Sequence, residues 1–299
     1  MMTRVATYGG SRSTLANIQR SFVRLDRAQE QVVTGKRVNR VSDNPTDGVS
    51  SVINRTLLKR LEQYERNATE ADAWLLANDS ALADSATSLI SARSRLVQVG
   101  GAPDAVARKA IADELRATAE TMIGTANATK AGRQIFSGTA DVATAYALDG
   151  SYLGNATPVT IPVFDSIAIR VDRMGPEVFG VYDAGDPSAG NIFQQLRWMA
   201  DEIEAGNVAV AASGLGTIDH ALERLATAQV ELGTRHAQLE SIQANIAGSK
   251  VSTTAAISKN EDVDAAEAIM NWRTRQSAYE SALKVSAQTM QQSLLDFIR

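Results

Sequence analysis

The chain has 299 residues, a formal net charge of −4 and a hydrophobic content of 44%. It contains no cysteine, which excludes disulfides, thiolate metal sites and cysteine nucleophiles. Only two histidines are present, and no run of 18 apolar residues is long enough to predict a membrane span.

The N-terminal segment, residues 1–45, predicts an extended start followed by an amphipathic helix. The apolar residues that define the helix recur at spacings of three and four: Leu15, Ile18, Phe22, Leu25 and Val32. Such a stripe needs a partner helix to cover it, so we expect an assembly interface here. Residues 1–60 also hold eleven Lys and Arg against four acids. We expect these cations to meet acidic surfaces of neighbouring subunits, because the interleaved aromatic side chains typical of single-strand nucleic-acid binding are missing.

A predicted loop, residues 41–53, leads into the longest periodic stretch of the chain. Residues 54–99 contain neither proline nor glycine, and apolar residues recur there every seven positions. The seam that we expect to face a partner helix comprises Leu61, Tyr64, Leu75, Leu82, Leu89 and Leu96. A sustained heptad repeat predicts a coiled-coil rod, roughly 65–70 Å long at about 1.5 Å rise per residue. With a further helix over 105–131, residues 46–135 form the predicted ascending rod.

The middle of the chain, residues 136–190, has a different character. Four of the six prolines lie between positions 158 and 187, next to short alternations of Val and Ile. The sequence FDS (164–166) predicts a hairpin turn between two such strands, with Pro162 confining the first strand to a sheet edge. We therefore predict a small β-rich domain inserted at the tip of a helical hairpin.

Helical periodicity resumes after this insertion. Residues 191–255 predict a descending rod with its seam at Leu225, Leu232 and Leu239. Residues 256–299 predict a C-terminal amphipathic assembly helix, which a capping box of Ser258 and Glu261 would begin. Its interface side chains are Ile269, Trp272, Tyr279, Leu283, Met290, Leu294 and Phe297. The predicted fold is therefore mainly α, a long antiparallel coiled-coil rod built from both chain ends.

No motif predicts a catalytic, cofactor or metal site. The sequence TGKR (34–37) lacks the first glycine and the final Ser or Thr of a phosphate loop. The carboxylates Glu261, Asp262, Asp264 and Glu267 do not fit a calcium loop. An enzyme remains an alternative only if the β-rich segment holds a site that its sequence does not reveal.

A family resemblance is carried mainly by the two ends of the chain. The N-terminal pattern is LANIQRSFVRLDRAQEQVVTGKRVNRVSDNPTDGVSS (15–51). RQIFSGT (133–139) and GPEVFG (175–180) flank the predicted insertion, and ISKNEDVDAAEAIMNWRTRQSAYESAL (257–283) follows near the end. In order and spacing these segments resemble the bacterial flagellin superfamily, and within it the hook-associated proteins of the hook–filament junction.

The resemblance implies a structural protein that links the hook, through hook-associated protein 1, to the flagellin filament. It implies export through the flagellar type III apparatus, an export chaperone before secretion, and an extracellular place at the hook–filament junction. Copies would assemble in a helical ring when the two chain ends fold together against their neighbours. It implies neither a cofactor nor binding to nucleic acid nor membrane insertion.

Two alternatives remain at this stage. A short flagellin, the filament subunit itself, would show the same ends and rods, although SDNP, GPEVFG and the short insertion depart from its usual pattern. A soluble coiled-coil scaffold protein would be a stable helical oligomer as a purified chain. A junction protein would instead be largely monomeric, with protease-sensitive ends.

Overall fold

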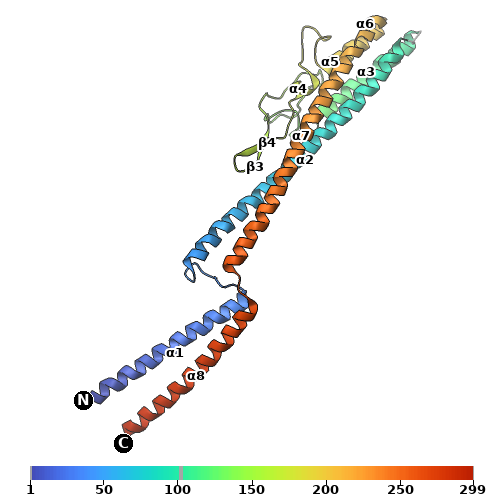
Figure 1. Ribbon diagram of the computed structural model, residues 1–299. Coiled ribbons are helices and arrows are strands. Elements are labelled where there is room, and N and C mark those ends of the chain that lie inside the picture. The colour runs from blue at the N-terminus through green and yellow to red at the C-terminus, as the bar shows by residue number, and fades with distance from the viewer. Residues whose placement is uncertain (1, 101–103, 299) are drawn as a thin grey trace. The chain divides into compact units, whose positions relative to one another are not determined.

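The computed structural model describes the backbone of residues 2–100 and 104–298, and the side chains of residues 12–100 and 104–288. The chain divides into two compact units, one formed by residues 61–248 and the other by residues 1–60 with 249–299. Figure 1 shows the course of the chain through its helices and strands.

The rod of the 61–248 unit is an antiparallel pair of long helices, α2 (Pro45–Val99) and α7 (Leu215–Glu261) (Figure 1). Arg93 Nε lies 2.7 Å from Asp219 Oδ1, and His236 Nε2 lies 2.9 Å from Asp72 Oδ1. These pairs show the antiparallel register, because one partner's number falls as the other's rises. The leucines between the helices are each at most 2% exposed: Leu61, Leu75, Leu82, Leu89, Leu96, Leu225, Leu232 and Leu239.

A second pair of helices, α3 (Ala105–Ala126) and α5 (Ile192–Glu204), lies beside the rod. The Arg116 guanidinium joins them, with Nη2 2.7 Å from Asp201 Oδ1. The short helix α6 (Val208–Ser213) leads from α5 to α7. Helix α3 ends at Ala126 rather than at residue 131 as predicted, because Asn127 caps it and a hairpin begins two residues later.

The stretch between α3 and α5 contains two small antiparallel sheets and one short helix, α4 (Gly175–Phe179), and the first sheet precedes the predicted insertion at 136–190. The strands are β1 (Thr129–Lys130), β2 (Arg133–Gln134), β3 (Thr160–Phe164) and β4 (Ile167–Arg170). The hairpin predicted around residues 164–166 is confirmed, since β3 pairs with β4 across that turn. Between the strands the segment is largely irregular, and it is stabilised by packed aromatic rings with centroids 5.0–5.8 Å apart: Phe136, Tyr146, Phe179 and Phe193.

Contacts to α2 show that the inserted segment lies along the flank of the rod. Tyr64 Oη donates a hydrogen bond of 2.7 Å to Asp165 Oδ1, and Asn67 Nδ2 donates one of 2.7 Å to the Pro162 carbonyl. The fold class predicted from the sequence is confirmed, because long helices dominate and the sheets are small. The periodicity of the sequence did not predict that the inserted segment packs against α2.

The other unit contains α1 (Met2–Thr34) and α8 (Ala265–Ile298), which run antiparallel and side by side (Figure 1). The loop predicted at 41–53 is wrong in its bounds, since α2 already begins at Pro45. Proline suits the first position of a helix, and the Asn44 side chain accepts a hydrogen bond of 3.3 Å from the Asp47 N–H.

The start of α8 also differs from the prediction. Ser258 lies within α7, which continues to Glu261, so the predicted capping box is wrong. Asp264 caps α8 instead, because its Oδ1 accepts a hydrogen bond of 2.8 Å from the Ala266 N–H. A short turn, residues 262–264, therefore separates α7 from α8.

Candidate assembly interface

The terminal helices α1 and α8 leave much of their apolar stripe uncovered. Leu15 is 57% exposed, Phe22 53%, Leu283 41% and Ile269 40%. The other described members of the predicted interface are half-buried: Ile18, Leu25, Val32, Trp272 and Tyr279. The side chains of Met290, Leu294 and Phe297 lie outside the described residues. Large apolar side chains left exposed along a helix pair indicate a surface that another molecule can cover.

One ring contact connects the two terminal helices. The rings of Phe22 and Tyr279 lie 5.8 Å apart between centroids, in a tilted arrangement. Such a pair contributes about 0.5–1.5 kcal/mol beyond the area that it buries. The predicted stripes of the two ends therefore meet, but each also presents apolar surface outward.

The rod seam contrasts with this terminal pair. Its leucines are buried within one chain, so they stabilise the rod itself. Tyr64 is the exception in the predicted seam, because it is half-buried and its ring packs 5.7 Å from that of Phe164 in the inserted segment. The seam leucines thus support the fold, whereas Leu15, Phe22, Ile269 and Leu283 of the terminal pair stay exposed.

An ionic cluster around Glu261, the corner clamp, joins loop 35–44 to the end of α7. The Glu261 carboxylate is held by Lys36 Nζ at 2.8 Å, and by Arg55 through Nε at 2.8 Å and Nη2 at 2.5 Å. The backbone adds to the corner, since the Val263 N–H donates a hydrogen bond of 3.0 Å to the Gly35 carbonyl. Gly35 has φ +68°, in the left-handed region that favours glycine.

The electrostatics of the corner clamp favour the ionised carboxylate. Glu261 is only 4% exposed, and burial alone would raise its pKa. Hydrogen bonds from Arg55, followed by those from Lys36 and the charges of both, outweigh burial and lower the pKa of Glu261 to about 2. Sequence reasoning missed this clamp and placed Glu261 only in the first turn of a helix. Its partners are more than 200 residues away in the chain, so no local pattern could have revealed it.

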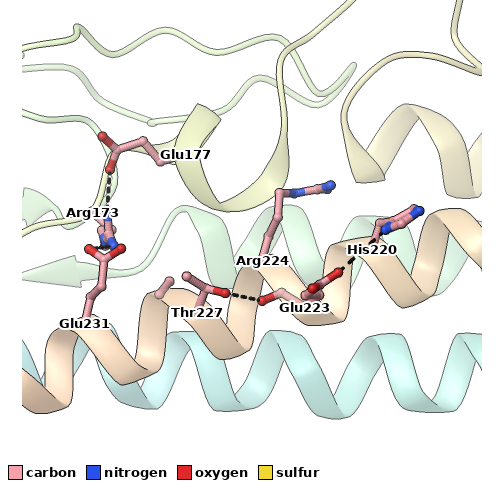
Figure 2. A pocket seen from close by; sticks show the side chains of 8 residues that line it. Arg173, Glu177, His220, Glu223, Arg224, Thr227 and Glu231 are labelled. Atoms are coloured by element: carbon pink, nitrogen blue, oxygen red, sulfur yellow. Dashed lines mark hydrogen bonds and ion pairs between the residues drawn. The ribbon is translucent and has the colours of Figure 1, made fainter.

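A second group of charges fastens the inserted segment to α7, and Figure 2 shows it around a pocket of about 430 Å³. Arg173 Nη1 lies 3.2 Å from Glu177 Oε2 of α4, and the same guanidinium pairs with Glu231 of α7. On the neighbouring turns of α7, Arg235 Nη1 donates a hydrogen bond of 3.1 Å to the Asp172 carbonyl. These cations and carboxylates neutralise one another, so the arrangement holds two elements together and offers no reactive group.

Within residues 12–100 and 104–288, no group of three or more His, Cys, Asp or Glu is placed to hold a metal ion. Within the same ranges no helix is both long and apolar enough to cross a bilayer. The surface with the clearest potential for interaction is therefore the terminal helix pair.

Comparison with known proteins identifies the family. The bacterial flagellin N-terminal helical region matches residues 5–141, and the flagellin C-terminal helical region matches residues 215–298. The two matches together cover well over half of the chain. The chain belongs to the flagellin family. The N-terminal match contains α2 and nearly all of α1, and the C-terminal match contains α7 and α8.

Individual relatives of this flagellin-family chain align over most of their length. Flagellar hook-associated protein 3 of Salmonella typhimurium is 24% identical over 313 aligned residues, covering 98% of each chain. Flagellin of Bacillus subtilis is 24% identical over 276 residues, covering 88% of each. The solved structure of the flagellar junction protein FlgL from Legionella pneumophila superposes with a TM-score of 0.58 at 17% identity, covering 71% of this chain and all of that one.

These findings establish the general role of the chain. It is a structural protein of the bacterial flagellum and not an enzyme. The resemblance of its sequence to hook-associated protein 3 is likewise confirmed.

Proposed function

We propose that this chain is the junction protein between the flagellar hook and filament. The observation that carries the proposal is the end-to-end alignment with the hook-associated protein 3 of Salmonella typhimurium, which covers 98% of both chains. A flagellin would be expected to differ from the chain most in its central insertion. The short insertion here is the segment that packs against the rod through Tyr64 and Asn67.

The proposed mechanism is assembly through the two chain ends. Leu15, Phe22, Ile269 and Leu283 remain exposed on the α1–α8 pair. Complete burial of one such side chain stabilises an interface by about 1.5–3 kcal/mol. Amphipathic ends that fold only when neighbours cover them would keep the free chain monomeric and restrict assembly to the growing tube. Met290, Leu294 and Phe297 extend the same predicted interface.

The proposal names partners on both sides of the junction. One side of a ring of copies would contact hook-associated protein 1, and the other would present a template for flagellin. Before assembly the chain would be bound by an export chaperone and leave the cell through the flagellar type III apparatus. Its final place would be extracellular, at the hook–filament junction. A head-to-tail contact between copies builds a helical tube when its rotation does not close into a flat ring.

A short flagellin is the alternative. The Bacillus subtilis flagellin relative supports it, since its identity of 24% equals that of the hook-associated relative. The two functions differ in copy number, because a junction needs one ring of subunits whereas a filament needs thousands.

Deletion of the gene tests the proposal. If the chain is the junction protein, hooks should remain bare while unpolymerised flagellin accumulates in the medium. If it is the filament subunit, bare hooks should appear without flagellin in any fraction. Normal filaments would contradict both functions, provided that no second copy of the gene is present. Restoring the gene on a plasmid is the control.

A further inference from the structure

The unit formed by residues 1–60 and 249–299 contains a groove that presents both apolar and cationic side chains. It encloses about 380 Å³ between loop 35–44 and the start of α2. We call it the corner groove. Its lining includes Lys36, Arg40, Val41, Ser51, Val52 and Arg55. Val41 is 47% exposed and Val52 54%, and on the same stretch of α2 Val49 and Ile53 are also exposed. Apolar surface concentrated beside cations indicates an interaction surface.

The charge of the corner groove selects an anionic partner. Lys36 and Arg55 share one carboxylate, that of Glu261, so their two positive charges exceed its one negative charge. Arg40 adds a third cation, which is 72% exposed and reaches Glu30 only at 3.4 Å. Among the residues that line the groove, Lys36, Arg40 and Arg55 outnumber the one carboxylate, Glu261, so a carboxylate that enters it would find Arg40 as the exposed cation.

A surface of matching chemistry lies on the rod of the same chain. Between residues 61 and 84, α2 carries six acids and a single cation, Arg66. Asp72, Leu76, Asp79 and Ala83 follow one another at spacings of three and four, which places them on one face of the helix; we call this face the acidic stripe. Leu76 is 55% exposed, and a hollow of about 240 Å³ adjoins Leu76 and Asp79 at Gly233, where no side chain fills the space.

We propose that the corner groove of one copy binds the acidic stripe of a second copy. Asp79 would pair with Arg40, while Leu76 would pack against Val41 and Val52. The contact is heterologous, because it joins two different surfaces, so it propagates from copy to copy as a tube requires. This inference rests on the proposed function only in that copies assemble side by side; a junction ring and a filament would both satisfy it.

The absence of native cysteine allows a direct test by disulfide cross-linking. Two differently tagged chains, one with Val41→Cys and one with Leu76→Cys, are produced together in cells that lack the native gene, and their flagella are isolated and oxidised. A disulfide requires Cα atoms within about 7 Å, so a product that carries both tags and disappears on reduction is expected. Replacing Leu76→Cys by Leu148→Cys, which is 82% exposed on the inserted segment, should abolish the product.

Further variants keep the inference falsifiable. If either cysteine variant fails to assemble, Val52→Cys with Ala83→Cys is a second pair across the same contact. Arg40→Glu should reduce the cross-linked product, and Asp79→Arg on the other copy should restore it. Absence of both cross-links from assembled flagella, equal linking to Leu148→Cys, or linking of Val41→Cys to a protein of another mass would overturn the inference. The deletion phenotype tests the junction role separately, so each idea can fail without the other.

Discussion

At the scale of single residues, Glu261 is the side chain on which the corner clamp depends. It is buried between two cations from the N-terminal part of the chain, Lys36 before α2 and Arg55 within α2. Both cations are at least one-third exposed, so solvent already screens much of their charge. The carboxylate is the more critical member, because its removal leaves the hydrogen bonds of both partners unmade.

Glu261→Gln tests the clamp. A hydrogen bond to a charged group contributes about 1.5–3 kcal/mol, so we expect loop 35–44 to open more easily by about 2 kcal/mol, or ~30-fold in the opening equilibrium. Amide hydrogen exchange of this loop measures the change without requiring the whole chain to unfold. Glu267→Gln is the control, since Glu267 is exposed in the first turn of α8. Equal exchange in both variants would contradict the clamp.

The pH dependence of the same corner follows from the lowered pKa of Glu261. The folded-state pKa of about 2 lies below the ordinary value of 4.5. The contribution of Glu261 to stability is therefore fully present above about pH 4.5 and lost as pH falls toward 2. Pepsin cleaves in this acidic range, so cleavage within loop 35–44 can be measured against pH. The native protein should be cleaved faster in this loop as pH falls. Its cleavage rate should differ from that of Glu261→Gln at higher pH and equal it near pH 2. A difference in rate that stays constant with pH would contradict the lowered pKa.

At the residue scale, a sequence pattern can group side chains that repeat along one helix, but it cannot group side chains that only the fold brings together. Leu82 and Leu232 could be placed in a seam because the heptad is local, and both are buried. Lys36, Arg55 and Glu261 could not be grouped, because only the folded chain brings them together. The same limit explains Tyr64, which fits the heptad but contacts Phe164 of the inserted segment.

At the scale of elements, the rod is stabilised by alternating large and small residues. Ala68, Ala71 and Ala92 lie buried among the seam leucines of α2. Small residues let the helices approach closely, while the leucines fill the space between them. Asn78 adds a polar member to the core, and its side chain donates a hydrogen bond of 3.2 Å to the Val171 carbonyl.

Leu82→Ala should expose how much the rod depends on its seam. Leu82 is fully buried, and truncating a buried leucine typically costs about 3–5 kcal/mol because a cavity remains. Urea unfolding followed by the fluorescence of Trp74 and Trp198 should therefore show a lowered midpoint. Ile90→Ala is the matched control, since Ile90 lies on the same helix but is 59% exposed. A midpoint shift of similar size in both variants would argue against a specific seam.

Element boundaries were predicted less well than element types. Pro45 was placed in a loop because proline breaks helices, although it is the first residue of α2 and is compatible with that position. Ser258 and Glu261 match a capping pattern, yet α7 continues through them and Asp264 supplies the cap. In the second case two capping residues six positions apart, Ser258 and Asp264, were both available, and the sequence did not show which of them begins the helix.

At the scale of the whole molecule, the two compact units differ in how completely they bury their apolar side chains. Residues 61–248 bury their seam and aromatic core within one chain. Residues 1–60 with 249–299 leave Leu15 and Phe22 exposed. Stability and assembly should therefore be separable by changes confined to the ends.

Removing residues 1–40 tests this separation. The deletion takes away α1 and leaves α8 without its partner helix, so assembly into flagella should be lost. The 61–248 unit should keep its thermal unfolding transition, because none of its core residues is removed. Differential scanning calorimetry of the purified chain and electron microscopy of the cells measure the two effects. Normal filaments from the shortened chain would contradict assembly through the ends.

Loss of the first 40 residues could also prevent export, so a finer variant must distinguish export from assembly. Leu15→Ser with Phe22→Ser keeps the full length and replaces two exposed apolar side chains of α1. If these side chains bind neighbouring copies, the variant should be exported into the medium but be absent from isolated flagella. Val230→Ser is the control, because Val230 is 68% exposed on α7 and lies outside both proposed surfaces. Incorporation of the double variant at the native level would show that α1 contributes charge or length to the tube rather than apolar contact.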